Sequence, residues 1–158
     1  EALQTQFSVM FRKLFEGGEG YLSLTNPDDL LSTGVEVEVV VPGKKKQRLE
    51  LLSGGERAMS ASAFLFSLLK VKPSPLVVLD EVDAPLDGRN VERFLRVLKE
   101  FEGTTQFILI THNPVTIETA PIWLGVTMQE PGVTSVIPCR APESALVASA
   151  GEPAYMKG

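Results

Sequence analysis

The sequence contains very little cysteine and no long apolar stretch. Its single cysteine, Cys139, cannot form an intrachain disulfide, which fits a reducing compartment. No apolar run reaches the length of about 18 residues that a membrane-spanning helix needs. The first residues also lack the basic-then-apolar pattern of a signal peptide. We therefore expect a cytoplasmic protein with no membrane partner.

Positive charge is also scarce. The 158 residues include 15 Lys and Arg but 20 Asp and Glu, so the net charge is −5. This balance argues against a protein that coats nucleic acid through its overall charge, although a local basic patch stays open. The length predicts one domain, and with 44% hydrophobic residues the chain can bury a core. Glu1 is not a methionine and lies within a helical pattern, so we expect a fragment of a longer protein.

A phosphate-binding loop is missing as well. The pattern G-x-x-x-x-G-K-[ST] occurs nowhere in the sequence, and the glycine-rich stretch at 17–20 has neither the lysine nor a following helix. Such a loop holds nucleotide phosphates through its backbone N–H groups and its lysine. The chain by itself therefore cannot build a complete nucleotide site.

Hydrophobic periodicity predicts an α/β fold: a parallel sheet with flanking helices, plus antiparallel hairpins. We expect helices at 1–15, at 53–69, between Asp87 and Gly103, and briefly at 117–120. The helix at 53–69 is apolar almost all round, which is typical of a buried helix. We expect strands at 20–24, 35–41, 47–51, 76–79, 107–110, 122–128 and 133–138. The runs at 76–79 and 107–110 do not alternate, which indicates parallel strands covered on both faces.

The start of the helix at 53–69 carries a capping box. Ser53 is followed by Glu56, and each side chain can bond to the backbone of the other. Gly54 and Gly55 fill the first turn and leave its N–H groups bare. Such a helix N-terminus can bind an anion, but the glycines can also serve only as a tight entry into the helix. Arg57 is either a phosphate or partner contact or an ordinary surface residue.

Acidic side chains and the single histidine follow the two buried strands. Asp80 and Glu81 come directly after 76–79, and His112 follows 107–110. Carboxyl ends of parallel strands meet at one sheet edge, where ligands bind, so we expect these three residues to lie close together. Paired carboxylates there fit a divalent metal and a general base. Turn or cap acids and a structural histidine are the alternative interpretation.

Basic residues cluster at the expected hairpin tip after the strand at 35–41. The cluster consists of Lys44, Lys45, Lys46 and Arg48. Such a run can contact DNA phosphates, but it is more often a solvated turn that protects a sheet edge. Both interpretations stay open.

Three motifs stand in the order found in ABC ATPases. Leu52-Ser53-Gly54-Gly55-Glu56 resembles the signature, 76–81 resembles Walker B with its catalytic glutamate, and His112 resembles the switch histidine. Other segments of the sequence resemble the C-terminal ATPase lobe of a bacterial structural-maintenance-of-chromosomes (SMC) protein. They lie at 15–18, 42–45, 79–84, 106–107, 110–113 and 125–130. Pro85 and Pro114-Val115 depart from the usual pattern.

The resemblance covers about residues 1–140 and implies a C-terminal head lobe. Residues 1–15 would be the returning coiled-coil helix, and 141–158 would be a loosely ordered tail outside the resemblance. Full-length proteins of this kind carry the P-loop in a separate N-terminal lobe, beyond a long coiled coil.

The resemblance also implies ATP and Mg²⁺ as cofactors. Asp80 would hold Mg²⁺ through water, Glu81 would polarise the attacking water, and His112 would contact the γ-phosphate. The signature residues would cap the γ-phosphate bound by the opposite head: Ser53, Gly54, Gly55 and Glu56. Asp83 and Asp87 would lie in the D-loop at that interface.

The function implied is ATP hydrolysis that drives head engagement and release in chromosome condensation, organisation and segregation. The partners implied are the N-terminal P-loop lobe of the same protein, a second SMC head in a homodimer, a kleisin subunit and DNA at the nucleoid. Two alternatives stay open. One is the head half of a coiled-coil DNA-repair ABC ATPase, which the segment 125–130 disfavours. The other is a non-catalytic domain that binds a partner through its terminal hairpin and tail.

Overall fold

The computed structural model of the chain describes residues 1–29 and 31–140. Contacts divide the chain into two compact units, the first Glu1–Thr111 and the second beginning at His112. The length predicts one domain, whereas the contacts separate two units, and the expected lobe at 1–140 spans both. Within the described residues, no helix is both long and apolar enough to cross a membrane.

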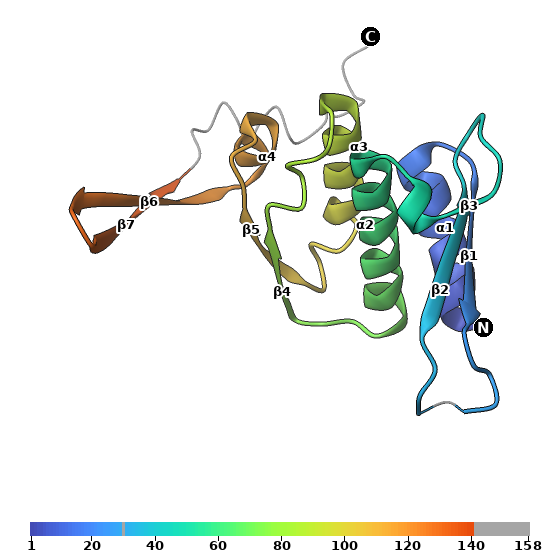
Figure 1. Cartoon of the computed structure of the whole chain (residues 1–158). Coiled ribbons are helices and arrows are strands. Elements are labelled where there is room, and N and C mark those ends of the chain that lie inside the picture. The colour runs from blue at the N-terminus through green and yellow to red at the C-terminus, as the bar shows by residue number, and fades with distance from the viewer. Residues whose placement is uncertain (30, 141–158) are drawn as a thin grey trace, which may run out of the picture. The chain divides into compact units, whose positions relative to one another are not determined.

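Three helices supply the core of the first unit (Figure 1): α1 (Ala2–Phe15), α2 (Gly54–Val71) and α3 (Gly88–Lys99). The apolar stripe of α1 is buried as its spacing predicts, with Phe7 and Phe11 fully covered. Phe66 of α2 and Phe94 of α3 join them in one hydrophobic cluster. Aromatic side chains therefore link the helices, with the Phe66 and Phe94 ring centroids 5.5 Å apart.

The prediction that α2 is buried all round is wrong. Ala61 is exposed, and Leu68 keeps 40% of its surface accessible. Several of the buried positions are instead serines: Ser60, Ser62 and Ser67. Their hydroxyls donate to the carbonyl four residues back, which satisfies each hydroxyl inside the core. Small polar residues thus occupy part of the packed face.

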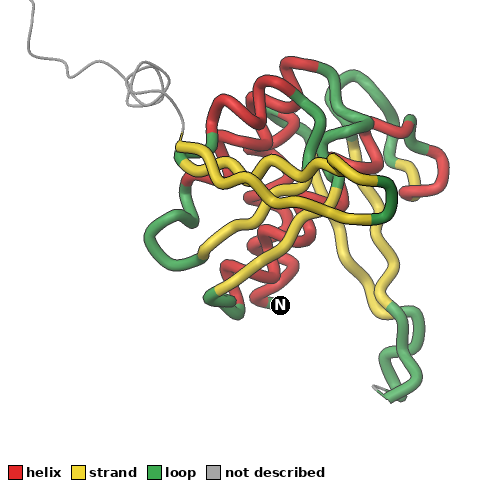
Figure 2. Tube along the Cα trace, turned by 90° about the vertical axis from the view of Figure 1, so that its left-hand side faces the viewer, coloured by secondary structure: helices red, strands yellow, loops and turns green. Residues whose placement is uncertain are grey.

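An antiparallel sheet in the order β1-β2-β3 follows α1 (Figure 2). Its strands are β1 (Glu19–Leu24), β2 (Val35–Val40) and β3 (Gln47–Arg48). The return strand predicted at 47–51 is therefore much shorter, because Leu49–Leu51 form a 3₁₀ turn, η1. The Arg57 guanidinium donates to the carbonyls of Leu49 and Glu50 in this turn.

The predicted parallel pair is present as β4 (Leu76–Asp80) and β5 (Gln106–Ile110), joined through α3. The prediction that both faces are covered is wrong for this structure. Alternate side chains point to opposite faces of a strand. One face carries Leu79, which is buried in the helix core. The other face is between 42% and 56% exposed at Leu76, Val78, Ile108 and Ile110.

The second unit contains α4 (Pro114–Thr119), β6 (Ile122–Glu130) and β7 (Val133–Arg140). Asn113 caps α4 by accepting a hydrogen bond from the N–H of Val115 at 3.0 Å. β6 and β7 pair antiparallel, which confirms the predicted terminal hairpin. Gly132 has a φ of 80° in the turn between them. The predicted tail at 141–158 lies outside the described residues.

Candidate functional site

The predicted capping box is present at the start of α2. The Ser53 hydroxyl accepts a hydrogen bond from the Glu56 N–H at 3.4 Å. In return, Glu56 Oε2 accepts from the Ser53 N–H at 3.1 Å and from the Ser53 hydroxyl at 2.9 Å. Both residues therefore fix the entry into the helix, and the serine hydroxyl is already engaged with the glutamate.

The two signature glycines differ in their surroundings. A Cβ added to Gly54 would meet nothing within 4 Å, so this position opens to solvent. A Cβ added to Gly55 would lie 3.0 Å from the carbonyl oxygen of Pro85. Gly55 therefore packs closely against the loop that follows β4. The structure thus joins the signature to the segment that the sequence identified as the D-loop.

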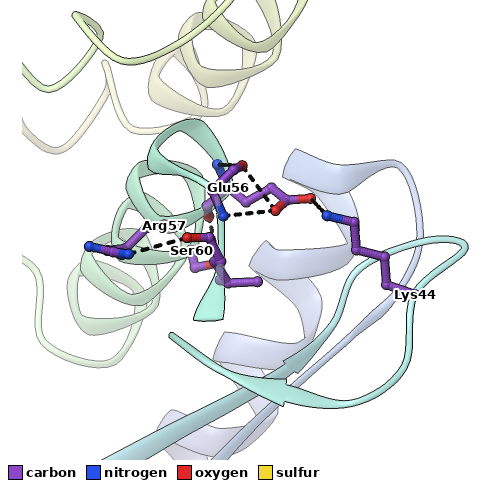
Figure 3. A network of polar contacts seen from close by, with 6 residues as sticks. Lys44, Glu56, Arg57 and Ser60 are labelled. Carbon is purple, nitrogen blue, oxygen red and sulfur yellow. Dashed lines mark hydrogen bonds and ion pairs between the residues drawn. The ribbon is translucent and has the colours of Figure 1, made fainter. Parts of the chain in front are cut away.

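Glu56 also forms an ion pair with Lys44 (Figure 3). The Lys44 ammonium lies 2.7 Å from Glu56 Oε1, on the carboxylate oxygen that does not contact Ser53. This hydrogen bond from Lys44 is the largest cause that lowers the pKa of the Glu56 carboxyl from its usual 4.5, and the bonds from Ser53 add to it. Partial burial opposes the shift. Glu56 is therefore held in its ionised form.

Arg57 is a contact within the chain. Its guanidinium donates to the carbonyls of Leu49 at 3.3 Å and of Glu50 and Leu52 at 3.2 Å each. These three acceptors lie in the segment that leads into Ser53. The sequence did not suggest that Arg57 would hold the segment leading into the signature. This contact depends on where η1 folds.

At the end of β4 the backbone turns sharply. Asp80 is exposed, and Glu81 has a φ of 49°, one of two non-glycine residues with positive φ among those described. The Glu81 N–H donates to the Ile110 carbonyl at 2.8 Å, so the bonding between β4 and β5 continues by one residue. A left-handed glutamate is uncommon and costs free energy, and such conformations concentrate at functional sites.

The two D-loop acids have different positions. Asp83 is only 3% exposed and accepts a hydrogen bond from the Thr111 hydroxyl at 2.6 Å. Asp87 caps α3 and accepts from the Asn90 N–H at 2.9 Å. The role of these acids at a head interface stays a prediction. The sequence did not indicate the bond between Thr111 and Asp83, since it depends on how the loop after β4 folds.

The carboxyl ends of β4 and β5 bring Asp80, Glu81, Asp83 and Thr111 to one edge of the first unit. His112 follows Thr111 directly, is exposed, and begins the second unit. Its proximity to Asp80 and Glu81 stays a prediction. The structure thus confirms the sheet edge that the sequence indicated.

The basic cluster is largely neutralised. Lys44 pairs with Glu56, as described above. Lys46 lies 2.6 Å from Glu38, and Arg48 lies 2.9 Å from Glu36. Lys45 is exposed and forms no ion pair within the described residues. Paired charges favour the interpretation as a solvated turn, while DNA contact stays a prediction.

Comparison with protein-family models matches residues 10–135 to the RecF/RecN/SMC N-terminal domain. The chain belongs to the RecF/RecN/SMC family. The resemblance to SMC proteins is thereby confirmed at the level of the family. The description of the family domain refers to an N-terminal region, so the match does not confirm the expected C-terminal lobe.

Several SMC relatives align with most of this chain. Chromosome partition protein Smc of Bacillus subtilis (strain 168) is 54% identical over 142 residues, which make up 90% of this chain and 12% of that protein. The same-named protein of Mycobacterium tuberculosis (strain ATCC 25618 / H37Rv) is 48% identical over 135 residues, or 85% of this chain and 11% of that protein. The chain therefore spans only a small part of the curated relatives it matches.

Solved SMC structures share the fold. One is described as "Structural biochemistry of ATP-driven dimerization and DNA stimulated activation of SMC ATPases". It has a TM-score of 0.78 and 38% identity, covering 94% of this chain and 90% of that one. Another is an Smc head domain with an extended coiled coil, bound to the C-terminal domain of ScpA, from Pyrococcus furiosus. It has a TM-score of 0.80 and 39% identity, covering 94% of this chain and 37% of that one.

The donor set of this SMC chain is compatible with Mg²⁺ only as part of a larger site. Among the described residues, no group of three or more His, Cys, Asp or Glu side chains is arranged to hold a metal ion. Mg²⁺ needs no such cage, because it keeps several waters and takes one or two carboxylates together with substrate phosphates. The exposed Asp80 carboxylate at the sheet edge fits a contact of this kind.

Proposed function

We propose that this chain is one half of an SMC-type ATPase head and supplies the signature, Walker B and switch motifs to an ATP site. The observation that carries the proposal is the contact of Gly55 with the loop after β4, where an added Cβ would lie 3.0 Å from the Pro85 oxygen. The N-terminus of α2 and the carboxylates of Asp80 and Glu81 lie in the same unit, Glu1–Thr111. A phosphate-binding helix end and a carboxylate edge are the parts that nucleotide hydrolysis needs.

The missing parts belong to a separate segment. The sequence has no G-x-x-x-x-G-K-[ST], so the P-loop must come from elsewhere in the protein. We assign the chain to the C-terminal half of the head, because its motifs run in the order signature, Walker B, switch. In this assignment α1 is the helix that returns from a coiled coil, and the N-terminal lobe supplies the P-loop.

Asp80, Glu81 and His112 would have separate roles in hydrolysis. Mg²⁺, when bound, would neutralise charge on the phosphates. Asp80 would hold a water of that ion, Glu81 would polarise the attacking water, and His112 would help to position it. Positioning and electrostatics supply most of the catalysis in phosphoryl transfer, so a small set of groups suffices.

The signature would act on a second head. The N-terminus of α2 opens outward at Gly54, so it can receive a phosphate that another subunit presents. ATP would then join two heads, and hydrolysis would release them. The ATP-driven dimerisation named for the similar SMC ATPase structure supports this arrangement.

The wider function we propose is chromosome partition in the cytoplasm, at the nucleoid. The Smc relatives support this over a DNA-repair ATPase. The ScpA-bound head from Pyrococcus furiosus supports a ScpA-type kleisin as a partner, and the DNA-stimulated activation named for the other structure supports DNA as an effector.

The experiment uses the complete head, with this chain joined to its P-loop lobe. Ser53→Arg places a bulky side chain at the N-terminus of α2 and should abolish ATP-dependent head dimers while nucleotide binding persists. Ser23→Arg adds the same side chain at an exposed serine of β1 and is the matched control. Dimerisation is measured by light scattering with and without ATP. Normal dimers in Ser53→Arg would show that the signature does not act across the interface.

A further inference from the structure

We propose that Lys44 is a positioning residue for the signature. Its ammonium group holds the carboxylate of Glu56, and Glu56 in turn holds Ser53 at the N-terminus of α2. The inference rests on the proposed function, because it concerns how the signature receives a phosphate. It assigns a role to a lysine that the sequence grouped with a basic turn.

The turn before β3 fixes the place of Lys44. The Lys44 N–H donates to the Val41 carbonyl at 2.9 Å, and Gly43 between them has a φ of 80°. Pro42 followed by a glycine of positive φ is the pattern of a type II turn. Val41 is buried, so the turn is anchored in the core. Lys44 therefore emerges from a rigid turn, which lowers the entropy lost when its side chain pairs with Glu56.

The two oxygens of Glu56 serve different partners (Figure 3). Oε1 accepts from the Lys44 ammonium at 2.7 Å. Oε2 accepts from the Ser53 N–H at 3.1 Å and from the Ser53 hydroxyl at 2.9 Å. Lys44 therefore fixes the side of the carboxylate that Ser53 does not reach. Without that anchor, the carboxylate could rotate and leave the cap.

The serine hydroxyl has one proton to donate. In this structure that proton lies toward Glu56 Oε2. A phosphate oxygen arriving at the signature would accept this hydrogen bond instead, because a hydroxyl with one proton cannot donate fully to two acceptors. Glu56 would then lose one donor while a second anion approaches. Lys44 keeps the carboxylate bonded at that moment and offsets its negative charge.

The neighbouring lysines, Lys45 and Lys46, do not contact the signature as Lys44 does. Lys45 is exposed and forms no ion pair within the described residues, whereas Lys46 pairs with Glu38 on β2 at 2.6 Å. If the cluster acted only through general positive charge, Lys44 and Lys45 would be equivalent. The positioning role predicts that they differ.

The test compares Lys44→Met with Lys45→Met in the complete head. Both variants remove one positive charge from the same turn. Lys44→Met should raise the ATP concentration for half-maximal dimerisation by about two- to fivefold, the effect of losing an ion pair whose lysine is half exposed. Lys45→Met should leave this concentration unchanged. In both variants, binding of ATP to the undimerised head should also stay unchanged. Lys44→Arg should restore dimerisation, because arginine can also pair with the carboxylate.

A double-mutant cycle separates positioning from a fold defect. Glu56→Gln keeps an acceptor for Ser53 but removes the charge that Lys44 holds. In that background, Lys44→Met should have little further effect. Equal effects of Lys44→Met and Lys45→Met, or additive effects of Lys44→Met and Glu56→Gln, would overturn the positioning role. If Ser53→Arg also dimerises normally, the proposed function itself fails. If Ser53→Arg blocks dimers, only the role of Lys44 is lost.

Discussion

The Thr111 hydroxyl donates a hydrogen bond of 2.6 Å to the buried carboxylate of Asp83. The bond ties the end of β5 to the loop that follows β4, and Thr111 is the residue directly before His112. The loop after β4 and the end of β5 are thus linked through a partly buried polar contact. Buried contacts of this kind hold a loop in one conformation.

Thr111→Val should destabilise the protein by about 1–3 kcal/mol, because valine has the same shape but removes a donor from a buried carboxylate. Thr5→Val, at an exposed threonine of α1, is the control and should change stability little. Urea unfolding followed by circular dichroism measures the difference. An unfolding free energy equal to that of the wild type would mean that the bond contributes nothing.

Glu81→Gln should lower ATP turnover by about 10²–10⁴-fold, the usual contribution of a general base. Glutamine keeps the size of the side chain but cannot act as a base, so nucleotide binding and head dimerisation should persist. Dimers with uncleaved ATP should therefore accumulate, as gel filtration in ATP can show. Glu92→Gln, at an exposed position of α3, should turn over normally. Near-normal turnover in Glu81→Gln would refute the assignment of the base.

The capping carboxylate should titrate below its usual range. The bond from Lys44 lowers the pKa of Glu56 from 4.5 in the folded state. Its stabilising effect is therefore fully present above pH 4.5 and is lost as the pH falls through the folded pKa. Carbon-detected NMR of the carboxyl group measures this pKa. Lys44→Met should shift it upward, and an unchanged value would show that the ion pair does not persist in solution.

The two signature glycines should respond differently to alanine. Gly54→Ala should stabilise the folded protein by about 0.5–1 kcal/mol, since alanine is the better helix former and its Cβ meets open space. Gly55→Ala should gain less or lose stability, because its Cβ would lie 3.0 Å from the backbone oxygen of Pro85. Thermal unfolding of the pair gives the comparison. Equal stabilisation by the two substitutions would mean that the loop after β4 moves away from the added Cβ at no cost.

Local patterns predicted much of the fold. The capping box at Ser53 and Glu56 depends on residues three apart, and the parallel pairing of β4 with β5 follows from the helix between them. The cap could be inferred because it depends on residues one turn apart, and the pairing because a strand, a helix and a second strand in sequence form a parallel unit. The residues at the carboxyl ends of these strands were found for the same reason.

Contacts between distant positions could not be predicted. Lys44 meets Glu56 and Gly55 meets Pro85 only after the elements have packed. The Arg57 clamp likewise depends on the 3₁₀ turn at Leu49–Leu51, where we expected a return strand. The burial of α2 was overestimated, because serines that bond to their own helix occupy part of its packed face.

In the proposed head dimer, the signature of one head completes the ATP site of the other. Full-length protein should be co-expressed as two differently tagged forms, one carrying Ser53→Arg and the other carrying a substitution of the P-loop lysine in its N-terminal lobe. Each form alone should hydrolyse no ATP. The purified mixed dimer contains one intact P-loop facing one intact signature, so we predict that it regains ATP turnover. A mixed dimer as inactive as its two parents would show that the signature does not act on the ATP site of the other head.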